Sequence, residues 1–214
     1  MTTTDRRIVW LLIAYTLMLA LLPVVLNEQA FQWTFSETGP FEQLSIAGWL
    51  GTAVIVLLRI RPLGARAWAF ALLCLAFAAR EADWHKLFTG ESFLKNSFYR
   101  DAARPFEEKL ICGAIAISLV ALVLYAGLVI ARFLFLQGGW RSRSGAWLMA
   151  GTALVVIGKL IDRLPAVLSV DYGIELGPLT KHYSAAFEEG LEMAHPLILA
   201  WSVWISQTGR RYLS

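Results

Sequence analysis

Charged residues are scarce in this chain. Asp, Glu, Lys and Arg together make up 16% of its 214 residues, whereas 57% are hydrophobic. A soluble domain normally carries about 25% charged residues to cover its surface. The apolar residues also come in blocks rather than at the spacing of an amphipathic helix, which is typical of helices surrounded by lipid. The composition therefore argues against a soluble globular protein.

Cysteine and histidine are also rare, with two cysteines and three histidines in the whole chain. Cys74 and Cys112 lie in different apolar blocks and have neither the spacing of a disulfide framework nor that of a zinc finger. Basic residues are scattered among the loops without a stripe or motif, so the net charge of +3 does not indicate a nucleic-acid partner. Low-complexity tracts and soluble-domain segments are absent too, and we expect residues 1–214 to form a single transmembrane domain.

Six apolar blocks can be drawn along the chain. They predict an all-α, polytopic integral membrane protein, a six-transmembrane-helix bundle with spans at about 8–27, 43–60, 67–87, 109–134, 146–166 and 186–207. Nine tryptophans lie mostly near the block ends, where an indole can straddle the membrane interface. Residues 91–104 mix aromatic and charged side chains and predict a short interfacial helix in the outer loop.

The loops alternate between two kinds. The short loops and the chain ends are rich in arginine, and together they hold ten arginines and one acid, Asp5. The longer loops and their flanks hold the remaining nine basic and fifteen acidic residues. Cytoplasmic loops of membrane proteins are enriched in Lys and Arg. The sequence therefore predicts a protein of the bacterial inner (plasma) membrane with both termini in the cytoplasm.

Three of the six blocks are too short to cross a membrane without charged residues. The apolar runs 67–79 and 145–158 reach about 20 Å at 1.5 Å per residue, against a hydrocarbon core of roughly 30 Å. The last block has only residues 197–206 after Pro196. Ionisable residues inside a membrane normally face the protein interior or a wet cavity. We therefore expect an outward-facing ionisable chamber lined by Arg80, Glu81, Asp83, His85, Lys159, Asp162, Arg163, Glu188, Glu189, Glu192 and His195.

Helical spacing groups several of these residues. Glu188, Glu192 and His195 lie within an arc of about 60° on one helix face. Glu81 and His85 are four residues apart, so a continuous helix places them one turn apart on the same side. The spacing thus predicts two acid–histidine groups on two helices that face one chamber.

Prolines and glycines predict local features of the same helices. Pro196 cannot donate to the carbonyl of Glu192, so we expect a kink and a free carbonyl beside the acids. In the same way we expect Pro165 to break the fifth helix. Gly48 and Gly51 are spaced to let the second helix pack closely against a neighbour.

Three interpretations of the chamber remain open. The Glu192-x-x-His195 spacing, with Glu81 and His85, suits a zinc or iron ion, although a di-iron site needs two such motifs and only one is present. Without a metal, a buried Glu beside a His can move protons as an acid and base. The charges can also form a structural network of salt bridges. A b-type haem between the two histidines is a weaker alternative.

The leading functional hypothesis is a membrane-embedded hydrolase or transferase that acts at the outer leaflet on a lipid or lipid-linked substrate. In it the residues that perform the chemistry or bind a metal are Glu81, His85, Glu188, Glu192 and His195. Those that hold the substrate or orient the acids are Arg80, Lys159, Asp162 and Arg163. The alternatives are a non-catalytic scaffold for other membrane subunits and a small-solute or proton-linked transporter. Transport needs a path to the inner face, where the blocks have essentially no ionisable residues.

Overall fold

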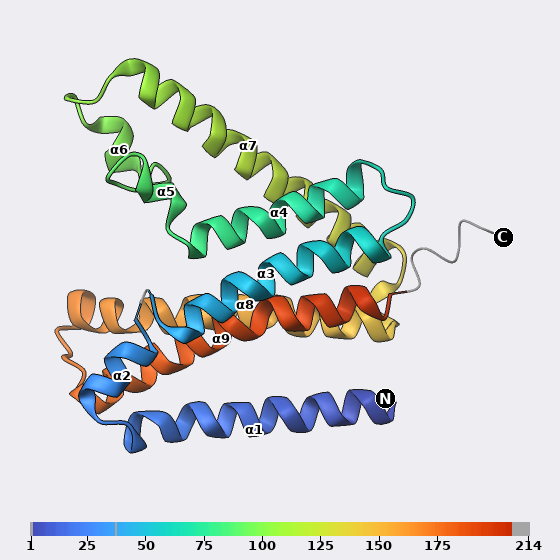
Figure 1. Ribbon diagram of the computed structural model, residues 1–214, viewed down its shortest axis with the longest axis horizontal. Helices are drawn as coiled ribbons and strands as arrows, with labels where there is room; N and C mark the ends of the chain where they lie inside the picture. The colour runs from blue at the N-terminus through green and yellow to red at the C-terminus, as the bar shows by residue number, and fades with distance from the viewer. Residues whose placement is uncertain (1, 37, 207–214) are drawn as a thin grey trace.

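The computed structural model describes residues 2–36 and 38–206, and every regular element in these ranges is a helix. Within them, six long helices form a bundle (Figure 1). They are α1 (Thr3–Val25), α3 (Pro40–Arg59), α4 (Ala65–Glu81), α7 (Phe106–Ala131), α8 (Arg143–Tyr172) and α9 (Pro178–Trp204). The connections contain α2 (Glu28–Thr34), α5 (Trp84–Leu87), α6 (Asn96–Arg100), the π turn η1 (Arg132–Leu136) and the 3-10 turn η2 (Gly139–Arg141).

Each predicted apolar block corresponds to one of the long helices, so the all-helical prediction is confirmed; residue 207 of the last block lies outside the described ranges. Among the described residues, three helical segments are long and apolar enough to cross a membrane: Thr3–Val25, Pro40–Arg59 and Phe106–Leu136. The other long helices of the described chain, α4, α8 and α9, are the ones that carry the ionisable residues singled out above.

Successive long helices run in opposite directions, so the start of α1 and the end of α9 lie at the same end of the bundle (Figure 1). The α3–α4 and α7–α8 connections lie at this end too. We call it the arginine end, after Arg6, Arg7, Arg59, Arg61, Arg66, Arg132, Arg141 and Arg143. The opposite end, with α2, α5, α6 and the α8–α9 connection, is called the acid end. The predicted alternation of loops thus matches the two ends of the bundle.

The third helix is shorter than predicted. α4 ends at Glu81 instead of continuing to residue 87, and Asp83 adopts a left-handed backbone conformation with φ of 53°. Asp tolerates this conformation better than most residues, because its short polar side chain can bond locally. Here the carboxylate pairs with Lys86 at 2.8 Å. The short helix α5 then starts in a new direction, and the expected continuous span 67–87 is wrong beyond Glu81.

The prolines inside α8 and α9 do not end these helices. α8 continues through Pro165 to Tyr172, so the predicted break is wrong. The carbonyl of Ile161, which Pro165 leaves without its helical donor, accepts a hydrogen bond from Ser184 of α9 at 3.3 Å. A proline is tolerated inside a helix when neighbouring side chains satisfy the freed backbone group. The sequence gives no direct sign of this pairing between helices.

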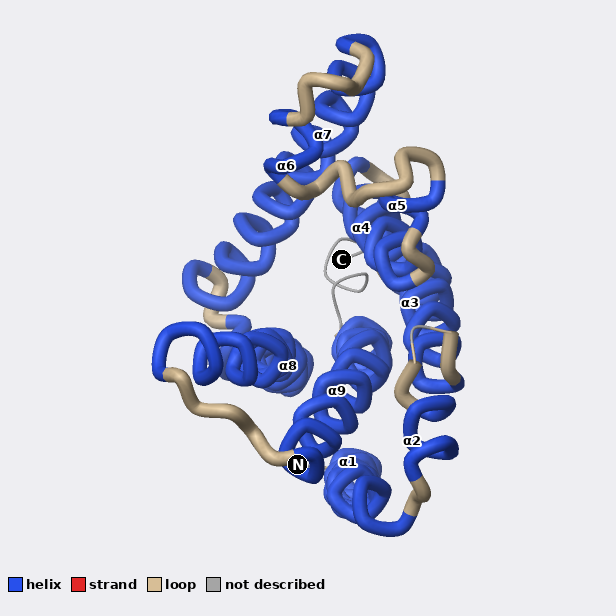
Figure 2. The backbone as a smooth tube through the Cα atoms, turned by 90° about the vertical axis from the view of Figure 1, so that its left-hand side faces the viewer, coloured by secondary structure: helices blue, strands red, loops and turns tan. Residues whose placement is uncertain are grey.

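α9 lies at the centre of the bundle and packs against α1, α3 and α8 (Figure 2). On α3, a Cβ at Gly48 would lie only 2.8 Å from Cγ of Pro196, which confirms the predicted close approach at this glycine. Thr52 donates to the carbonyl of Pro196 at 2.9 Å, and Ser45 donates to the freed carbonyl of Glu192 at 3.4 Å. Gly51 has open space around it and plays no part in this packing.

A second glycine brings α1 against α9. A Cβ at Gly190 would lie 2.6 Å from Cδ2 of the buried Leu19 and closer still to its Cδ1. Tyr15 donates from its hydroxyl to the carbonyl of Gly190 at 2.7 Å. Both contacts require the α1 backbone to lie close to α9 at this position.

Gly190→Ala is therefore expected to lower the free energy of unfolding by about 1–3 kcal/mol, because overpacking outweighs the roughly 1 kcal/mol of helix propensity that Ala adds. Thermal unfolding in detergent measures the effect. Gly190→Ala combined with Leu19→Ala provides the matched control, and its loss should be smaller than the sum of the two single losses, because Leu19→Ala removes the side chain that the new Cβ would meet. An unfolding temperature at or above that of the parent would contradict the close packing.

α4 packs on α3, and α7 packs on α4 while standing apart from α1 and α9 (Figure 2). The core between α3 and α4 contains Trp49 stacked on Phe77, with ring centroids 4.6 Å apart. Apolar side chains along the length of α7 are exposed, among them Ile117, Leu124 and Leu128. With this arrangement a cavity remains at the arginine end between α4, α7 and α8.

At the arginine end, the buried carboxylate of Asp5 joins α1 to α8. It accepts hydrogen bonds from Nε of Arg143 at 2.6 Å and from Nε1 of Trp147 at 3.0 Å. It also caps α1 by accepting from the backbone N–H of Thr2 at 3.0 Å and from its hydroxyl at 2.9 Å. Asp5 therefore holds two helices in register where the sequence shows only one acid among arginines.

Candidate functional site

Six half-buried acids from four helices lie together toward the acid end of the bundle. Glu42 comes from the first turn of α3, Glu81 from the last turn of α4, and Asp162 from α8, whereas Glu188, Glu189 and Glu192 come from α9. Glu81 interacts electrostatically with Glu42 and Glu192, and Glu189 with Glu42, Glu81, Glu188 and Glu192. We call this group the acid cluster.

Two cations neutralise part of the acid cluster. Nζ of Lys159 lies 3.2 Å from Asp162 and 3.3 Å from Glu192, so it joins α8 to α9. Nη1 of Arg80 lies 3.1 Å from Glu81. Both cations are thus engaged by acids of the cluster. With all eight side chains ionised, the six acids and two cations would leave a net charge of −4. The predicted role of these cations as binders of an anionic headgroup is therefore not favoured by the geometry.

Two pairs of acids in the cluster lie close to one another across neighbouring helices. Glu81 of α4 pairs with Glu192 of α9, and Asp162 of α8 pairs with Glu188 of α9. A carboxylate is only an acceptor, so a hydrogen bond between two carboxyl groups requires that one of them carries a proton. Like charges at such short range cannot both ionise without a large cost. The acid cluster can therefore hold protons beside carboxylates that are available to accept them.

His195 lies one turn along α9 from Glu192, on the same helix face as predicted. Only 6% of its surface is exposed. The imidazole packs against α8 at Gly158, where an added Cβ would lie 3.6 Å from Cε1 of the ring. It also bonds to the backbone of Leu154. Within the described residues its Nε2 atom has no hydrogen-bond partner. α9 thus holds a buried imidazole with one unused nitrogen beneath the acids, in contact with α8 at Gly158.

His85 does not join this group as expected. Because α4 ends at Glu81, His85 lies in α5 and the predicted one-turn pairing of Glu81 with His85 is wrong. Its Nδ1 lies 3.8 Å from the carboxylate of Asp83. His85 stands outside the long helices, and burial lowers the pKa of its imidazole, which favours the neutral form. The left-handed turn at Asp83 is the cause of this separation.

The arrangement gives no support to the zinc or iron site predicted on Glu192, His195, Glu81 and His85. Within the described residues there is no group of three or more His, Cys, Asp or Glu side chains that could hold a metal ion. Carboxylates that share protons with one another are also poor ligands until those protons leave. We therefore derive no chemistry from a metal at this site.

Arg163 and the predicted chamber also differ from expectation. Arg163 is exposed and makes no ion pair among the residues that the structure describes. A cavity of about 390 Å³ lies at the arginine end, and no residue of the acid cluster lines it. Access to the acid cluster comes instead from its surface side, where 46% of the Lys159 side chain and 34% of Asp162 are exposed.

Glu42 and Glu189 are the two members of the acid cluster that were not among the predicted catalytic, metal-binding or substrate-binding residues. Glu42 was separated from the other acids by the α2–α3 turn, and Glu189 points 100° away from Glu188 on a helical wheel. Their interactions with Glu81 and Glu192 arise because α3 packs on both α4 and α9. The density of acids in residues 188–192 and the short apolar run of the last block are the sequence signals for this group.

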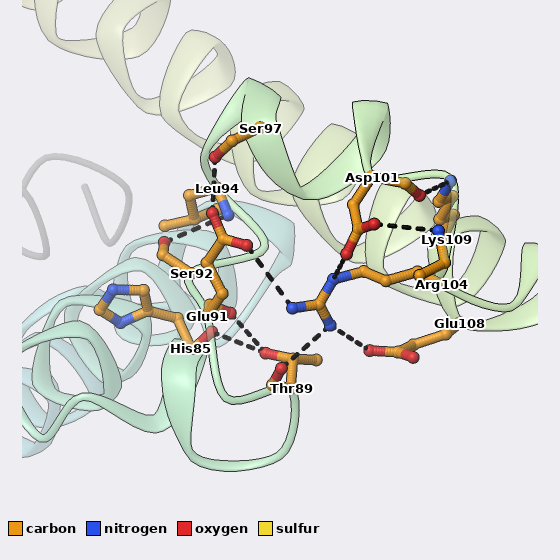
Figure 3. Close-up of polar contacts among 11 residues, drawn as sticks. His85, Thr89, Glu91, Ser92, Leu94, Ser97, Asp101, Arg104, Glu108 and Lys109 are labelled. Atoms are coloured by element: carbon orange, nitrogen blue, oxygen red, sulfur yellow. Dashed lines mark hydrogen bonds and ion pairs between the residues drawn. The ribbon is translucent and has the colours of Figure 1, made fainter.

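The charges between α5 and α7 form a separate network with a structural role (Figure 3). Arg104 lies at its centre and donates to the carbonyl of Thr89 and to Glu108, each at 3.0 Å. It also pairs with Glu91 at 3.5 Å and with Asp101 at 3.4 Å. The predicted helix in 91–104 is present only as the five residues of α6, and its buried Phe98 lies under the Arg104 guanidinium.

No family model, curated protein or solved structure matches this chain.

Proposed function

We propose that the chain is a six-span membrane protein and that the acid cluster is the site of an enzyme, a hydrolase or transferase, that acts on a lipid or lipid-linked substrate at the outer leaflet. The long helices α1, α3, α4, α7, α8 and α9 are the spans. The arginine end faces the cytoplasm of a bacterial cell, and the acid end faces outward. The alternation of arginine-rich and acidic ends supports this orientation.

Helix lengths support the proposed depth of the acid cluster. Counted from the arginine end at 1.5 Å per residue, Lys159 lies about 24 Å from Arg143 along α8, and Glu81 about 22 Å from Arg66 along α4. A hydrocarbon core is roughly 30 Å thick. The acids then lie in the outer third of the bilayer, close to the headgroups, and half-buried between helices rather than against lipid tails.

The observation that carries the proposal is the close approach of acids from different helices, Glu81 to Glu192 and Asp162 to Glu188, around the Lys159 ammonium. Pairs of acids in which one holds a proton and the other is ionised supply both partners of general acid–base catalysis. Lys159 fixes Glu192 from α8, and His195 offers a second proton acceptor one turn away. Glu192 therefore takes the central role, with Glu81 as its proton partner.

The charge of the acid cluster favours a neutral or positively charged group of the substrate at this position. Both cations are already engaged by acids, so an anionic phosphate placed among them would meet excess negative charge. A hydroxyl or an ammonium group of an amphiphile would instead donate hydrogen bonds to the carboxylates. The scissile bond then lies next to a hydroxyl or amine rather than at a phosphate.

The experiment compares proteoliposomes that contain the parent chain, Glu192→Gln or Glu175→Gln. They are incubated with a total bacterial lipid extract, and lipid products are followed by mass spectrometry. We expect one lipid species to be consumed by the parent and by Glu175→Gln, an exposed acid of the α8–α9 connection, but at least about 100-fold more slowly by Glu192→Gln. No turnover by the folded parent, or equal turnover by Glu192→Gln, would contradict the enzymatic proposal.

A structural charge network in a non-catalytic scaffold is the second candidate, favoured by the way Lys159 joins α8 to α9. It predicts that Glu192→Gln lowers stability without changing any lipid. A proton-linked transporter is less favoured, because apolar residues and the stacked Trp49–Phe77 pair fill the space between α3 and α4 beneath Glu81. The same proteoliposomes therefore distinguish the enzyme from the scaffold.

A further inference from the structure

The cavity at the arginine end has no role in the acid–base chemistry proposed above. It measures about 390 Å³, within the range of small-molecule sites, and its walls come from α3, α4, α7, α8 and α9. Most lining side chains are apolar, including Val56, Phe70, Leu73, Phe77 and Val129. The residues from Ile60 to Trp49 on α3 cover about 16 Å along the helix axis. An alkyl chain fits this length and lining.

The polar residues of the cavity gather toward its outer mouth at the arginine end. Arg66 lies in the first turn of α4, and Arg132 follows α7 as the first residue of η1. Arg66 and Arg132 are both exposed, and neither makes an ion pair with another described residue. Gln137, Ser144 and Ser206 line the same mouth. Two unpaired positive charges at one end of an apolar cavity complement an amphiphile with an anionic head.

The inner boundary of the cavity separates it from the acid cluster. Trp49 and Phe77 stack on each other there, and both line the cavity. Glu81 lies one turn of α4 beyond Phe77, on the far side of this stacked pair. A ligand of the cavity therefore enters with its head at the arginine end, not from the acid cluster.

The position of α7 leaves a lateral route to the cavity. α7 packs on α4 and stands apart from α9 (Figure 2), and its continuation through η1 carries Arg132, Phe133 and Gln137 to the cavity wall. The side chains of α7 are largely exposed and apolar, so lipid tails would surround this helix in a bilayer. A lipid can thus reach the cavity sideways from the leaflet on the arginine side.

We propose that this cavity binds one anionic phospholipid of the leaflet on the arginine side, with an acyl chain among the apolar side chains and the phosphate between Arg66 and Arg132. Arginine pairs well with phosphate because its planar guanidinium donates two parallel hydrogen bonds. The cytoplasmic leaflet is the one that carries anionic lipids. The proposal rests on the membrane insertion and orientation proposed above but not on the acid–base chemistry, so either can fail alone.

The test measures lipids retained by the purified protein with native mass spectrometry, after titration with phosphatidylglycerol or, as a zwitterionic probe, phosphatidylcholine. We expect one phosphatidylglycerol to bind the parent chain in preference to phosphatidylcholine. Arg66→Gln with Arg132→Gln should weaken that binding roughly thirtyfold, since each arginine near a membrane surface contributes about a factor of five. The matched control, Arg6→Gln with Arg61→Gln, removes two exposed arginines of the same end that do not line the cavity and should change little.

Val129→Trp provides a second variant that keeps both arginines and fills the cavity, and it should also abolish retention of phosphatidylglycerol. Equal binding of the two lipids, or equal weakening by the control pair, would overturn the proposal. So would a dimer of the parent chain that carries no lipid and that Val129→Trp converts to a monomer, because a second copy would then fill the cavity. The lipid-turnover assay with Glu192→Gln is independent of all these outcomes.

Discussion

A cysteine that replaces Lys159 should react at least about tenfold faster with a membrane-impermeant thiol reagent added outside intact cells than with the same reagent added outside inverted vesicles, where it meets the cytoplasmic face. The reaction needs a thiolate in contact with water. Lys159 has 46% of its side chain exposed and lies about 24 Å from the start of α8, near the outer edge of the proposed bilayer. Accessibility from one face only is therefore the expected signature of an enzyme site at the outer leaflet.

The background and the markers for this experiment come from the same chain. The two native cysteines, Cys74 and Cys112, are buried, and both are replaced by alanine before labelling. Cysteines at the exposed positions Glu175 and Arg61 serve as markers of the acid end and of the arginine end. Lys159→Cys removes two ion pairs and Asp162→Cys only one of them, so Asp162→Cys provides a second probe of the same surface.

Each labelling pattern has a distinct meaning. Labelling of the Glu175 position from outside and of the Arg61 position from inside supports the proposed orientation, and the reverse pattern would invert it. Labelling of position 159 from both faces would replace the enzyme by a transporter. Protection of position 159 from both faces would show that the acid cluster is closed to water, and the enzymatic proposal would then be lost.

The sequence was a good guide to properties that belong to single helices. Hydropathy located the six long helices, and the shortfall in apolar length correctly singled out the three that carry charges, α4, α8 and α9. The helical repeat placed Glu188, Glu192 and His195 together. These predictions succeed because periodicity and length are set by the backbone geometry of one helix and need no partner.

Properties that depend on two helices were missed or wrong. The break after Glu81 coincides with one left-handed residue, Asp83, whose carboxylate pairs with Lys86 of α5. The continuity of α8 through Pro165 depends on Ser184, which is 23 residues from the carbonyl that it serves. The local sequence around Pro165 does not predict that Ser184 bonds to the freed carbonyl. The arginine-end cavity likewise forms where the C-terminal part of α7 meets α3, α4, α8 and α9, and hydropathy contains no signal for that arrangement.

The role of Asp5 also depends on a contact between two helices. In the sequence it is only the single acid in an arginine-rich group of loops and chain ends. In the structure it is 1% exposed and accepts four hydrogen bonds, two of them from α8. Removal of a buried acceptor leaves its donors without partners, which costs more than the net value of the bonds themselves. The role of Asp5 therefore has an energetic test.

Asp5→Ala is expected to lower the free energy of unfolding by about 2–4 kcal/mol, because Nε1 of the buried Trp147 and the first turn of α1 lose their acceptor and Arg143 loses its ion pair. Arg143 is 41% exposed and can regain water, which keeps the loss below that of a fully buried ion pair. Asp5→Asn retains a side-chain acceptor without the charge and should cost about half as much. Thermal unfolding in one detergent compares these variants.

Asp171→Ala is the matched control, since it removes an exposed acid from the other end of α8 and should change stability by no more than about 0.5 kcal/mol. If Asp5 acts through Trp147, the loss in Asp5→Ala combined with Trp147→Phe will be smaller than the sum of the two single losses. Additive losses would mean that the Asp5–Trp147 contact contributes nothing. Because this contact fixes the start of α8 against α1, and α8 carries Lys159 and Asp162, a loosened arginine end should also weaken the Lys159–Glu192 pair in the middle of the helix.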